Sequence, residues 1–410
     1  MGLVTRRRLL TLAGVSAAGL VGARLALPSL LRRPPPRELD AETAEFVERL
    51  LDGIDRRRMW DVHAHVFGLG DGGTGCSVSH RSLSQLHVFE RARFDAFLAV
   101  AGVDPDSQDR DGDYVVRLLA LHRLGNPAGR LVILGFDQVV DEHGAVQPTA
   151  GPYHTPDEYV LSLAEQHPDL EAGVSIHPYR PDAVERLEAA VARGARLVKW
   201  LPAAMRIDPS SPLCDPFYAA LARLRTPLLT HAGAEGAVPA DAQEFGNPLR
   251  LRRPLEAGVR VIVAHCSGLG SHPDLDEPDE PRKRRRASKL FLRLMEEPEW
   301  EGQLFGGLSA VTQVNRAGSA LAELLRARHL HHRFVNGSDY PLPAVDPLIS
   351  TWYLQHKGYL DARERRLCNR VFDANPLLFD TVVKRCLTLR EGGRELRFSP
   401  TVFETDWLFT

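Results

Sequence analysis

Two histidines stand two residues apart in an apolar segment, DVHAHV at residues 61–66. In an extended strand, residues i and i+2 project from the same face, so the imidazoles of His63 and His65 would point in one direction together. Neutral imidazole is a common ligand of zinc and related cations. A lone buried histidine is more often a hydrogen-bonded core residue, and the pair by itself therefore indicates a metal only weakly.

Further ligand-type residues end other short apolar runs of the chain, namely Asp137, His177, Lys199, His231, His265 and Asp339. A charged group or an imidazole buried at such a place must be paired, hydrogen-bonded or metal-bound. Six ligand-type residues would then come from the same end of five strands, an arrangement that is improbable by chance. They are the first pair together with Lys199, His231, His265 and Asp339. The sequence thus predicts a divalent metal site formed by His63, His65, Lys199, His231, His265 and Asp339.

Strands and helices must alternate along the chain to place these residues at one end of a sheet. Apolar runs predict strands, and the stretches between them, with leucine and alanine at three- and four-residue intervals, predict helices. The eight predicted strands are 59–66, 130–139, 171–178, 195–202, 227–233, 259–268, 304–311 and 333–340. Eight parallel βα units match an α/β fold of the (β/α)8 TIM barrel type, whose strands present their carboxyl ends at the active face.

A doubly wound open sheet is the competing topology, and it would place a glycine-rich phosphate turn between its first strand and a helix. Residues 68–75 are glycine-rich, but no helix follows them directly. We interpret them as a flexible loop that could close over the barrel mouth. A helix is expected later in the same long segment, at residues 89–102.

The composition of the chain limits the classes of partner that the protein is expected to bind. The chain has 410 residues, 44% hydrophobic and 25% charged, with a formal net charge of -2. No global field would attract nucleic acid, and the expected partner is a small-molecule substrate; a homo-oligomer is left open. Five cysteines without a CxxC motif indicate neither a disulfide framework nor a cysteine-rich zinc site. The acidic run at 274–280 and the basic run at 282–286 offset each other, and we interpret them as one solvated loop.

The first residues resemble a twin-arginine export signal. The basic stretch TRRRLL at residues 5–10 opens an apolar run that extends to Ala23. We therefore predict an exported protein, periplasmic or otherwise extracytoplasmic; the alternative is an uncleaved N-terminal anchor, and membrane contact is expected only through this segment. The predicted organisation is a signal and proline-rich linker at 1–37, an N-terminal helix within 38–58, the barrel at 59–346, and a C-terminal helical extension and tail at 347–410.

The ordered set of strand-end residues resembles the amidohydrolase superfamily over about residues 59–380, and the segment NPLLF at 375–379 resembles a helix start of its amidohydrolase-2 branch. The resemblance implies that His63, His65 and Asp339 bind one divalent metal and that His231 joins it or a second ion. A carboxylated Lys199 would bridge two ions; alternatively it is a substrate-binding cation or an ion-pair partner. One or two ions per chain are therefore expected, zinc first, with manganese and iron as alternatives.

The reaction that this resemblance implies is metal-assisted hydrolysis of an amide, ester or lactone-type bond. Asp339 would orient the water and carry its proton to the leaving group, and His265, or a second metal ion, would polarise the scissile carbonyl. Two alternatives remain: a non-hydrolytic decarboxylase or hydratase using the same metal, and a catalytically inactive exported metal-binding barrel.

Four residues at or beyond the ends of predicted strands could contact the substrate: Trp200, which follows Lys199, and Tyr179, Arg180 and Arg316, which follow their strands. The two arginines would suit a carboxylate in the substrate. A surface position on a loop is an equal alternative for each of them. Glu235, four residues after His231, is either close to the site or on the surface.

Overall fold

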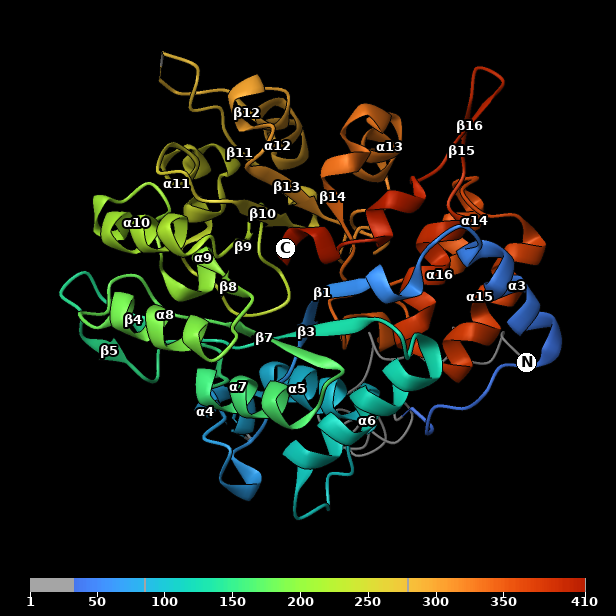
Figure 1. Ribbon diagram of the computed structural model, residues 1–410, viewed down its shortest axis with the longest axis horizontal. Helices are drawn as coiled ribbons and strands as arrows, with labels where there is room; N and C mark the ends of the chain where they lie inside the picture. Colours follow the sequence, from blue (N-terminus) through green and yellow to red (C-terminus); the bar gives the residue numbers. More distant parts are fainter. Residues whose placement is uncertain (1–32, 85, 279, 410) are drawn as a thin grey trace.

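A ring of eight parallel strands forms the centre of the protein (Figure 1). The structure is a computed structural model that describes residues 33–84, 86–278 and 280–409. In sheet order the strands are β1 (Trp60–His65), β3 (Arg130–Leu134), β7 (Leu170–Val174), β8 (Leu197–Trp200), β9 (Leu228–His231), β10 (Val261–Ala264), β13 (Leu304–Gly307) and β14 (Phe334–Val335). All eight predicted strands are therefore present.

Main-chain hydrogen bonds between the last and the first strand close the ring. The N–H of Val62 donates to the carbonyl of Asn336 at 3.1 Å, and the N–H of Asp339 donates to the carbonyl of His63 at 2.7 Å. Side chains of valine, leucine and isoleucine fill the interior of the ring, where Val62, Val132 and Ile262 are fully buried. The predicted (β/α)8 TIM barrel is confirmed.

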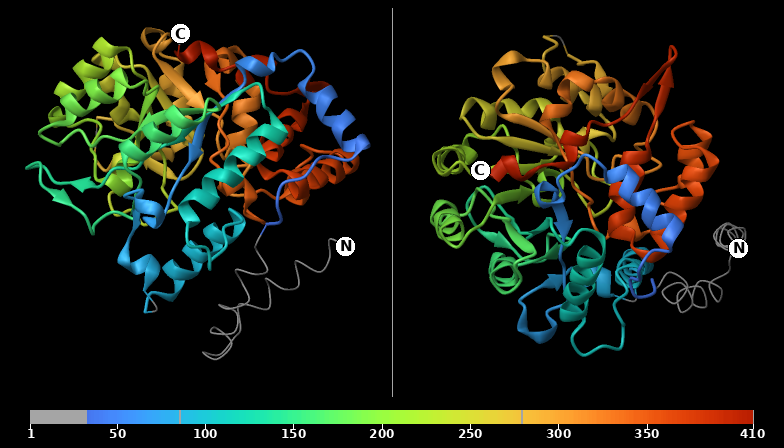
Figure 2. Two further views of the ribbon diagram at one scale, coloured as in Figure 1. Left: turned by 60° about the horizontal axis from the view of Figure 1, so that its bottom comes forward. Right: turned by 45° about the vertical axis from the view of Figure 1, so that its right-hand side comes forward.

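Helices surround the ring, as Figures 1 and 2 show. Those that lie between successive strands are α6 (Arg110–Gly125), α7 (Asp157–Gln166), α8 (Ala183–Ala192), α10 (Asp215–Leu224), α11 (Arg252–Glu256), α12 (Ala287–Met295) and α13 (Ser319–Arg326), and α9 (Pro202–Met205) is a single turn after β8. After the last strand come α14 (Thr351–His356), α15 (Ala362–Ala374) and α16 (Pro376–Cys386).

The Asn375-Pro376 pair has a clear local role at the start of α16. The Asn375 side chain accepts hydrogen bonds from the N–H groups of Leu377 and Leu378, and Pro376 occupies the first helical position, where its missing N–H is no loss. Asn375 Nδ2 also donates to the carbonyl of Leu121 at 2.7 Å. The same residue thus caps α16 and joins it to α6.

A long excursion separates β1 from α6. It contains β2 (Ser77–Val78), α4 (His80–Leu83) and α5 (Val88–Val100), and β2 pairs with β6 (Tyr153–His154) from the segment that follows β3. The helix expected at 89–102 is thus present as α5. A short hairpin, β4 (Val139–Val140) with β5 (Val146–Gln147), lies before β6.

The glycine-rich segment after β1 is anchored. The Asp111 carboxylate, at the start of α6, accepts hydrogen bonds from the N–H groups of Leu69 and Gly70 and from the Thr74 hydroxyl, at 2.6–3.1 Å. Gly70 lies in the left-handed region at φ 92, where its missing Cβ avoids strain. The residues expected to form a flexible loop are therefore fixed to the barrel by one buried carboxylate.

The described part of the N-terminal region docks on the C-terminal helices. The helix predicted at 41–54 is present as α3 (Ala41–Leu51), which packs beside α15 and α16 (Figure 2). The N–H of Arg37 donates to the carbonyl of Ala374 at 3.2 Å. The predicted export signal falls within residues 1–32, outside the described residues. Among the described residues, no helix is long and apolar enough to cross a membrane.

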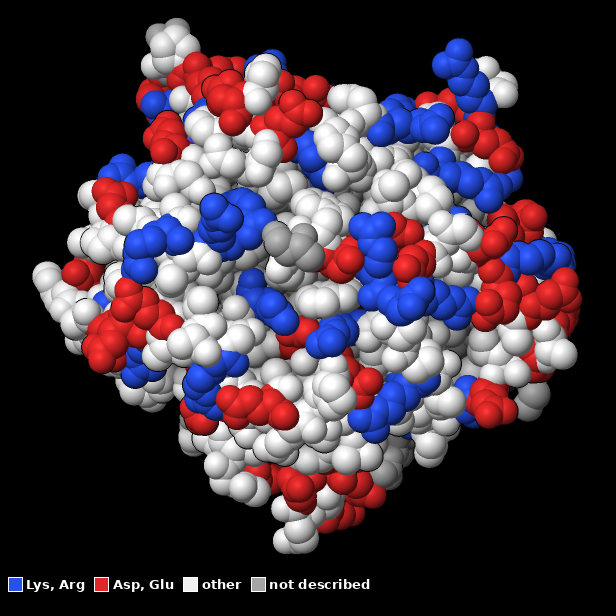
Figure 3. Space-filling view, viewed as in Figure 1, with Lys and Arg blue, Asp and Glu red and all other residues white. Residues whose placement is uncertain are grey.

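The C-terminal residues cover the base of the barrel. After a hairpin of β15 (Leu389–Glu391) and β16 (Arg394–Leu396), the chain returns to the amino ends of the strands. Phe409 stacks on Trp60 with ring centroids 5.1 Å apart, Trp407 packs on Phe305, and Leu408 is fully buried. Figures 1 and 3 view this base; acidic and basic side chains are interspersed over it. The expected irregular tail is a packed segment.

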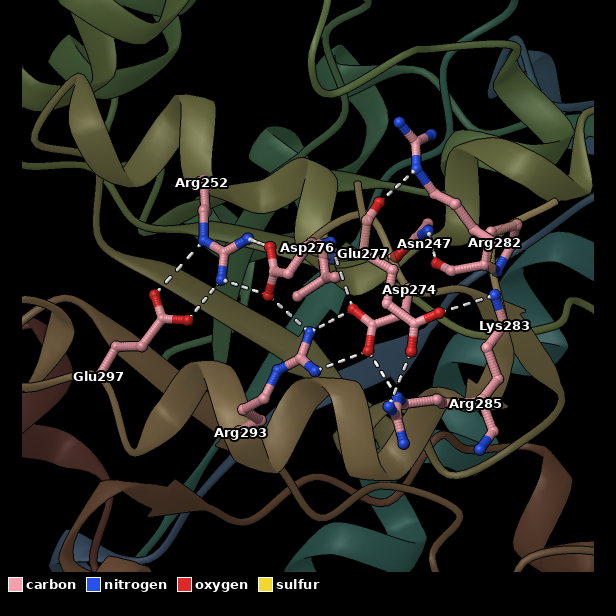
Figure 4. A network of polar contacts seen from close by, with 12 residues as sticks. Asn247, Arg252, Asp274, Asp276, Glu277, Arg282, Lys283, Arg285, Arg293 and Glu297 are labelled. Carbon is pink, nitrogen blue, oxygen red and sulfur yellow. Dashed lines mark hydrogen bonds and ion pairs between the residues drawn. The ribbon is translucent and has the colours of Figure 1, made fainter. Parts of the chain in front are cut away.

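The charged segment after β10 is an ordered ion-pair network, which corrects the interpretation as a solvated loop. Strands β11 (Ser271–Pro273) and β12 (Arg284–Arg286) pair antiparallel. Asp274 is 1% exposed and lies between the guanidinium groups of Arg285 and Arg293, which hold the pKa of its carboxyl well below its usual value against the effect of burial (Figure 4). Arg252 extends the network to Asp276 and Glu297. The opposite charges offset each other by direct pairing.

Candidate metal centre

Three ligand-type atoms converge at the carboxyl end of the barrel. His63 Nε2 lies 3.2 Å from His65 Nε2, and each of these nitrogens lies 3.2 Å from Asp339 Oδ1. A cation bound tetrahedrally at 2.0–2.1 Å would hold its ligand atoms about 3.3 Å apart. The three atoms therefore already have the mutual spacing that a small divalent cation requires.

The local backbone explains this convergence. His63 and His65 project from the same face of β1, as their two-residue spacing predicts. Asp339 follows β14 with a left-handed backbone, φ 63, which is strained for a residue with a Cβ and is typical of functional positions. Asp61 fixes the two strand ends against each other, because its Oδ1 accepts the N–H groups of both His63 and Ser338, at 3.0 and 2.9 Å.

His265 faces the opposite side of the same carboxylate. His265 Nε2 lies 3.9 Å from Asp339 Oδ2, and one atom each of His63, His265 and Asp339 lie within 4.8 Å of one another. His265 follows β10 at φ 58, again in the left-handed region. Asp339 thus directs one oxygen to the β1 histidines and the other to His265.

Ser309 connects two of the imidazoles from behind. Its hydroxyl lies 3.0 Å from His63 Nδ1 and 3.0 Å from His265 Nδ1, and its carbonyl lies 3.0 Å from His265 Nδ1. A carbonyl oxygen can only accept, so we assign the ring proton of His265 to Nδ1, which leaves a lone pair on its Nε2. We assign the same tautomer to His63, because Lys199 Nζ can only donate and lies 3.3 Å from His63 Nε2. Such second contacts orient metal-binding histidines in the required tautomer.

Lys199 and His231 complete the group. Lys199 Nζ, from β8, lies 3.3 Å from His63 Nε2. The His231 ring, from β9, packs on the His265 ring with centroids 5.3 Å apart, and its Nε2 lies 3.3 Å from Glu235 Oε2. The Nδ1 atoms of His65 and His231 are buried without a hydrogen-bond partner among the described residues. All six predicted ligand residues therefore line one pocket at the carboxyl end of the barrel, and His63, His265 and Asp339 have ligand atoms within 4.8 Å of one another.

Burial sets the protonation states of this group. It lowers the pKa of His63 from 6.5 to about 3 and that of His231 to about 4, so both imidazoles are neutral at pH 7. Burial alone would raise the pKa of Asp339, but His265 and His63 hold it well below its usual range. Burial also lowers the pKa of Lys199 to about 8, against the effect of Asp339 and Glu235. Neutral imidazoles beside an ionised carboxylate suit a divalent cation.

A pocket with a cavity volume of about 130 Å³ opens above the metal centre. The residues of the centre form its floor, and the excursion after β1 supplies much of its wall. Glu235 also lines it: Glu235 Oε1 accepts the N–H groups of Ala237 and Val238, and the side chain is 6% exposed. Glu235 therefore belongs to the site, which the sequence left undecided between the site and the surface.

The four residues predicted to contact substrate do not line this pocket. Arg180 makes two hydrogen bonds of 2.7 Å to the Asp137 carboxylate, and the Tyr179 hydroxyl accepts the N–H of Asp208. Trp200 is fully buried between barrel and helices, because residues i and i+1 of a strand face opposite sides and Lys199 faces inward. Arg316 is 9% exposed, hydrogen-bonded to the Gln313 side chain, and close enough to Asp339 to interact with its charge.

His177 is a structural histidine rather than a member of the centre. Its Nε2 lies 3.0 Å from the carbonyl of Met205, and its Nδ1 accepts the N–H of Tyr179 at 3.2 Å. Asp137, the other strand-end residue outside the ligand set, is paired with Arg180 and accepts the N–H of His177 at 2.8 Å. These two strand-end residues therefore connect loops to one another.

Sequence reasoning missed Ser309 and the aromatic wall of the pocket. Serine after a strand carries no signal of its own, and the wall residues lie in an excursion whose path the sequence pattern does not define. Ser309 does lie near the carboxyl end of the predicted strand 304–311, where the ligands also lie on their strands, and this is the one signal that pointed to it.

Comparisons with known proteins give matches among solved structures alone. No family profile matches the chain, and no curated protein is significantly similar to it in sequence. Solved structures similar in fold include a "probable 2-pyrone-4,6-dicarboxylic acid hydrolase" from Acinetobacter baumannii, with 14% identity over 80% of this chain and 96% of the other, at a TM-score of 0.43. A 5-carboxyvanillate decarboxylase from Sphingomonas paucimobilis has 10% identity over 78% and 98%, at a TM-score of 0.44.

A third similar structure is a dihydroxybenzoic acid decarboxylase from Polaromonas sp. JS666 with bound manganese and the inhibitor 2-nitroresorcinol. It has 13% identity over 77% of this chain and 97% of the other, at a TM-score of 0.43. Likeness at this level says nothing about the reaction or the substrate of the present chain.

Proposed function

We propose that this protein is a metal-dependent hydrolase of the amidohydrolase type, which cleaves an amide, ester or lactone-type bond in a small molecule. The observation that carries the proposal is the convergence of His63 Nε2, His65 Nε2 and Asp339 Oδ1 at mutual distances of 3.2 Å on the floor of a pocket. Lone-pair nitrogens and a carboxylate repel one another at this spacing unless a cation or protons lie between them.

The proposed division of labour follows from the contacts. His63, His65 and Asp339 would hold a divalent cation, with His231 and His265 on its other side. Such a cation lowers the pKa of a water molecule and polarises a substrate oxygen. Asp339 Oδ2, on the side facing His265, is placed to accept a proton from water and to pass it to the leaving group.

The tautomer assigned to His265 changes its expected role. Because Nδ1 donates to the carbonyl of Ser309, Nε2 carries a lone pair and cannot donate a hydrogen bond to a scissile carbonyl. His265 therefore serves as a ligand or as a proton acceptor. The cation, rather than His265, would then have to polarise the scissile carbonyl.

The chemical state of Lys199, carboxylated or not, distinguishes a two-ion site from a one-ion site in this proposal. A lysine reacts with carbon dioxide through its neutral amine, and burial lowers the pKa of Lys199 to about 8, which raises the neutral fraction near pH 7. Metal analysis of the purified protein tests the bridge: about two equivalents per chain support a carboxylated Lys199, and about one equivalent supports a single-ion site with Lys199 as a cation.

Product identification tests the reaction. The metal-loaded protein and a His65→Asn variant would be screened against amides, esters, lactones and aromatic carboxylic acids. Hydrolysis by the first and not by the second supports the proposal. Release of carbon dioxide without consumption of water would establish the decarboxylase alternative, hydration of a double bond would establish the hydratase, and metal binding without any turnover would support the inactive barrel.

We also propose that the protein is exported, on the basis of the basic and apolar residues 5–23 alone. Cell fractionation of the full chain beside a variant with Arg6, Arg7 and Arg8 changed to lysine would test this. Export of the parent and retention of the variant support the twin-arginine route, since lysine keeps the charge. Equal export of both would exclude that route.

A further inference from the structure

The wall of the pocket above the metal centre is apolar. It is formed by side chains from the excursion after β1, from β6 and from the loops that follow β8 and β14, namely Phe67, Phe94, Phe97, Tyr153, Leu201 and Leu342. Phe67 packs edge-on against Phe94, with ring centroids 6.4 Å apart, and also contacts the Tyr114 ring at 4.7 Å. The aromatic rings therefore support one another and form a fixed surface.

Cations are scarce on this surface. Among the described side chains that line the pocket, Lys199 is the only lysine or arginine, and it lies on the floor beside His63. Two arginines on the loops after β7 and β13 do not line the wall: Arg180 pairs with Asp137, and Arg316 bonds the Gln313 side chain near Asp339. A charged tail on a substrate would thus enter the wall region without a partner from any described residue there, which is unfavourable.

Glu235 adds a negative charge on the His231 side of the pocket. Its carboxylate is fixed by the N–H groups of Ala237 and Val238, and the segment that follows contributes Val238 and Pro239 to the wall. An anionic tail lying along this segment would meet a carboxylate rather than a guanidinium. The charge pattern therefore opposes anionic groups in this part of the pocket.

We infer that the non-reacting part of the substrate is an uncharged apolar group, aryl or alkyl, which packs against Phe67, Phe94, Phe97 and Leu342. The inference rests on the proposed function for its placement of the reacting bond at the metal centre. It names a substrate class that the metal centre alone does not specify, and it removes the carboxylate-bearing substrate that the sequence suggested through Arg180 and Arg316.

Two ligands that differ at the far end, where one carries an apolar methyl group and the other an anionic sulfonate, test this inference. The probes are 4-methylacetophenone and 4-acetylbenzenesulfonate, which share a ketone for the metal end; a sulfonate is a poor ligand for divalent cations. Their binding to the metal-loaded protein would be measured by saturation-transfer NMR titration. We expect the neutral ketone to bind about tenfold tighter or more.

Variants of wall residues test whether the preference for the neutral ketone arises from the wall of the pocket. Phe97→Lys places a cation there and should reduce or reverse the preference, and Val238→Lys is a second variant in case the first does not fold. Leu213→Lys is the matched control, because Leu213 is 44% exposed and does not line the pocket. The preference should be unchanged in this control.

Equal or tighter binding of the sulfonate would overturn the inference, and so would the lack of saturable binding of the neutral ketone. These outcomes are separate from those for the proposed function. Hydrolysis confined to substrates with a charged tail would refute the inference and leave the hydrolase intact. Preferential binding of the neutral probe without hydrolysis of any ester, amide or lactone would support the inference and refute the proposed hydrolase.

Discussion

Acidification should destabilise the protein through His177, which the fold keeps neutral. The imidazole is buried, its Nδ1 accepts the N–H of Tyr179 at 3.2 Å, and its Nε2 lies 3.0 Å from the carbonyl of Met205. A proton on Nδ1 would break the first contact and leave a buried charge. Burial accordingly lowers the pKa of His177 from 6.5 to about 4.

The sign and size of the effect follow from this shift. Between pH 6.5 and 4 the unfolded chain binds a proton that the folded chain does not, so the free energy of unfolding falls as the pH falls. The stabilisation is fully present above pH 6.5. Below it, each pH unit removes about 1.4 kcal/mol, and the whole window removes about 3 kcal/mol.

The assay is urea unfolding of the parent and of His177→Asn at a series of pH values from 7.5 to 4.5. Asparagine can accept the N–H of Tyr179 but does not titrate, so the difference in unfolding free energy between the two proteins should shrink by about 2–3 kcal/mol as the pH falls. His143→Asn, at an exposed position, should give a curve parallel to the parent. Parallel curves for the parent and His177→Asn would refute the reasoning, as would loss of metal from His177→Asn.

Further changes should act on activity, metal affinity and stability. Asp339→Asn should keep the fold and most metal binding but lose nearly all turnover; unchanged turnover would exclude its proton-carrying role. Ser309→Ala should weaken metal binding about 10- to 100-fold in chelator competition, because His63 Nδ1 loses the Ser309 hydroxyl while His265 Nδ1 keeps the main-chain carbonyl; unaltered affinity would contradict this. Lys384→Met should lower the free energy of unfolding by about 3–5 kcal/mol, because Asp380 is then a buried unpaired acid, and Asp380→Asn in the same chain should restore part of it. Asp274→Asn should expose the hairpin at 271–286 to limited proteolysis, and an unchanged cleavage rate would show that the ion pairs do not hold it.

The sequence predicts the repeating parts of this molecule well. Strands in a barrel must be apolar on both faces, so each appears as a short hydrophobic run, and the helices between them keep a regular spacing. The two-residue period of a strand then places His63 and His65 on one face. The same period places Trp200 and Lys199 on opposite faces of their strand. The sequence could therefore have predicted that Trp200 is buried among the helices.

The loops carry what the sequence does not predict. Arg180 and Asp137 lie 43 residues apart on separate loops, and only the folded positions of β3 and β7 bring them within 2.7 Å. The wall of the pocket depends on the excursion between β1 and α6, whose path is fixed by Asp111 through contacts some 40 residues distant in sequence. No local pattern encodes such pairings, so a single sequence indicates the chemistry of the site but not the shape of its entrance.

The packed base of the barrel limits the route by which substrate and product reach and leave the metal centre. Trp407, Leu408 and Phe409 cover the amino ends of the strands, and apolar side chains fill the ring above them. In the described part of the chain the barrel axis is packed at its base, so substrate and product would both pass through the pocket above the metal centre. Substrate and product must then exclude each other, and a product that leaves slowly would act as a competitive inhibitor and limit the rate of each cycle.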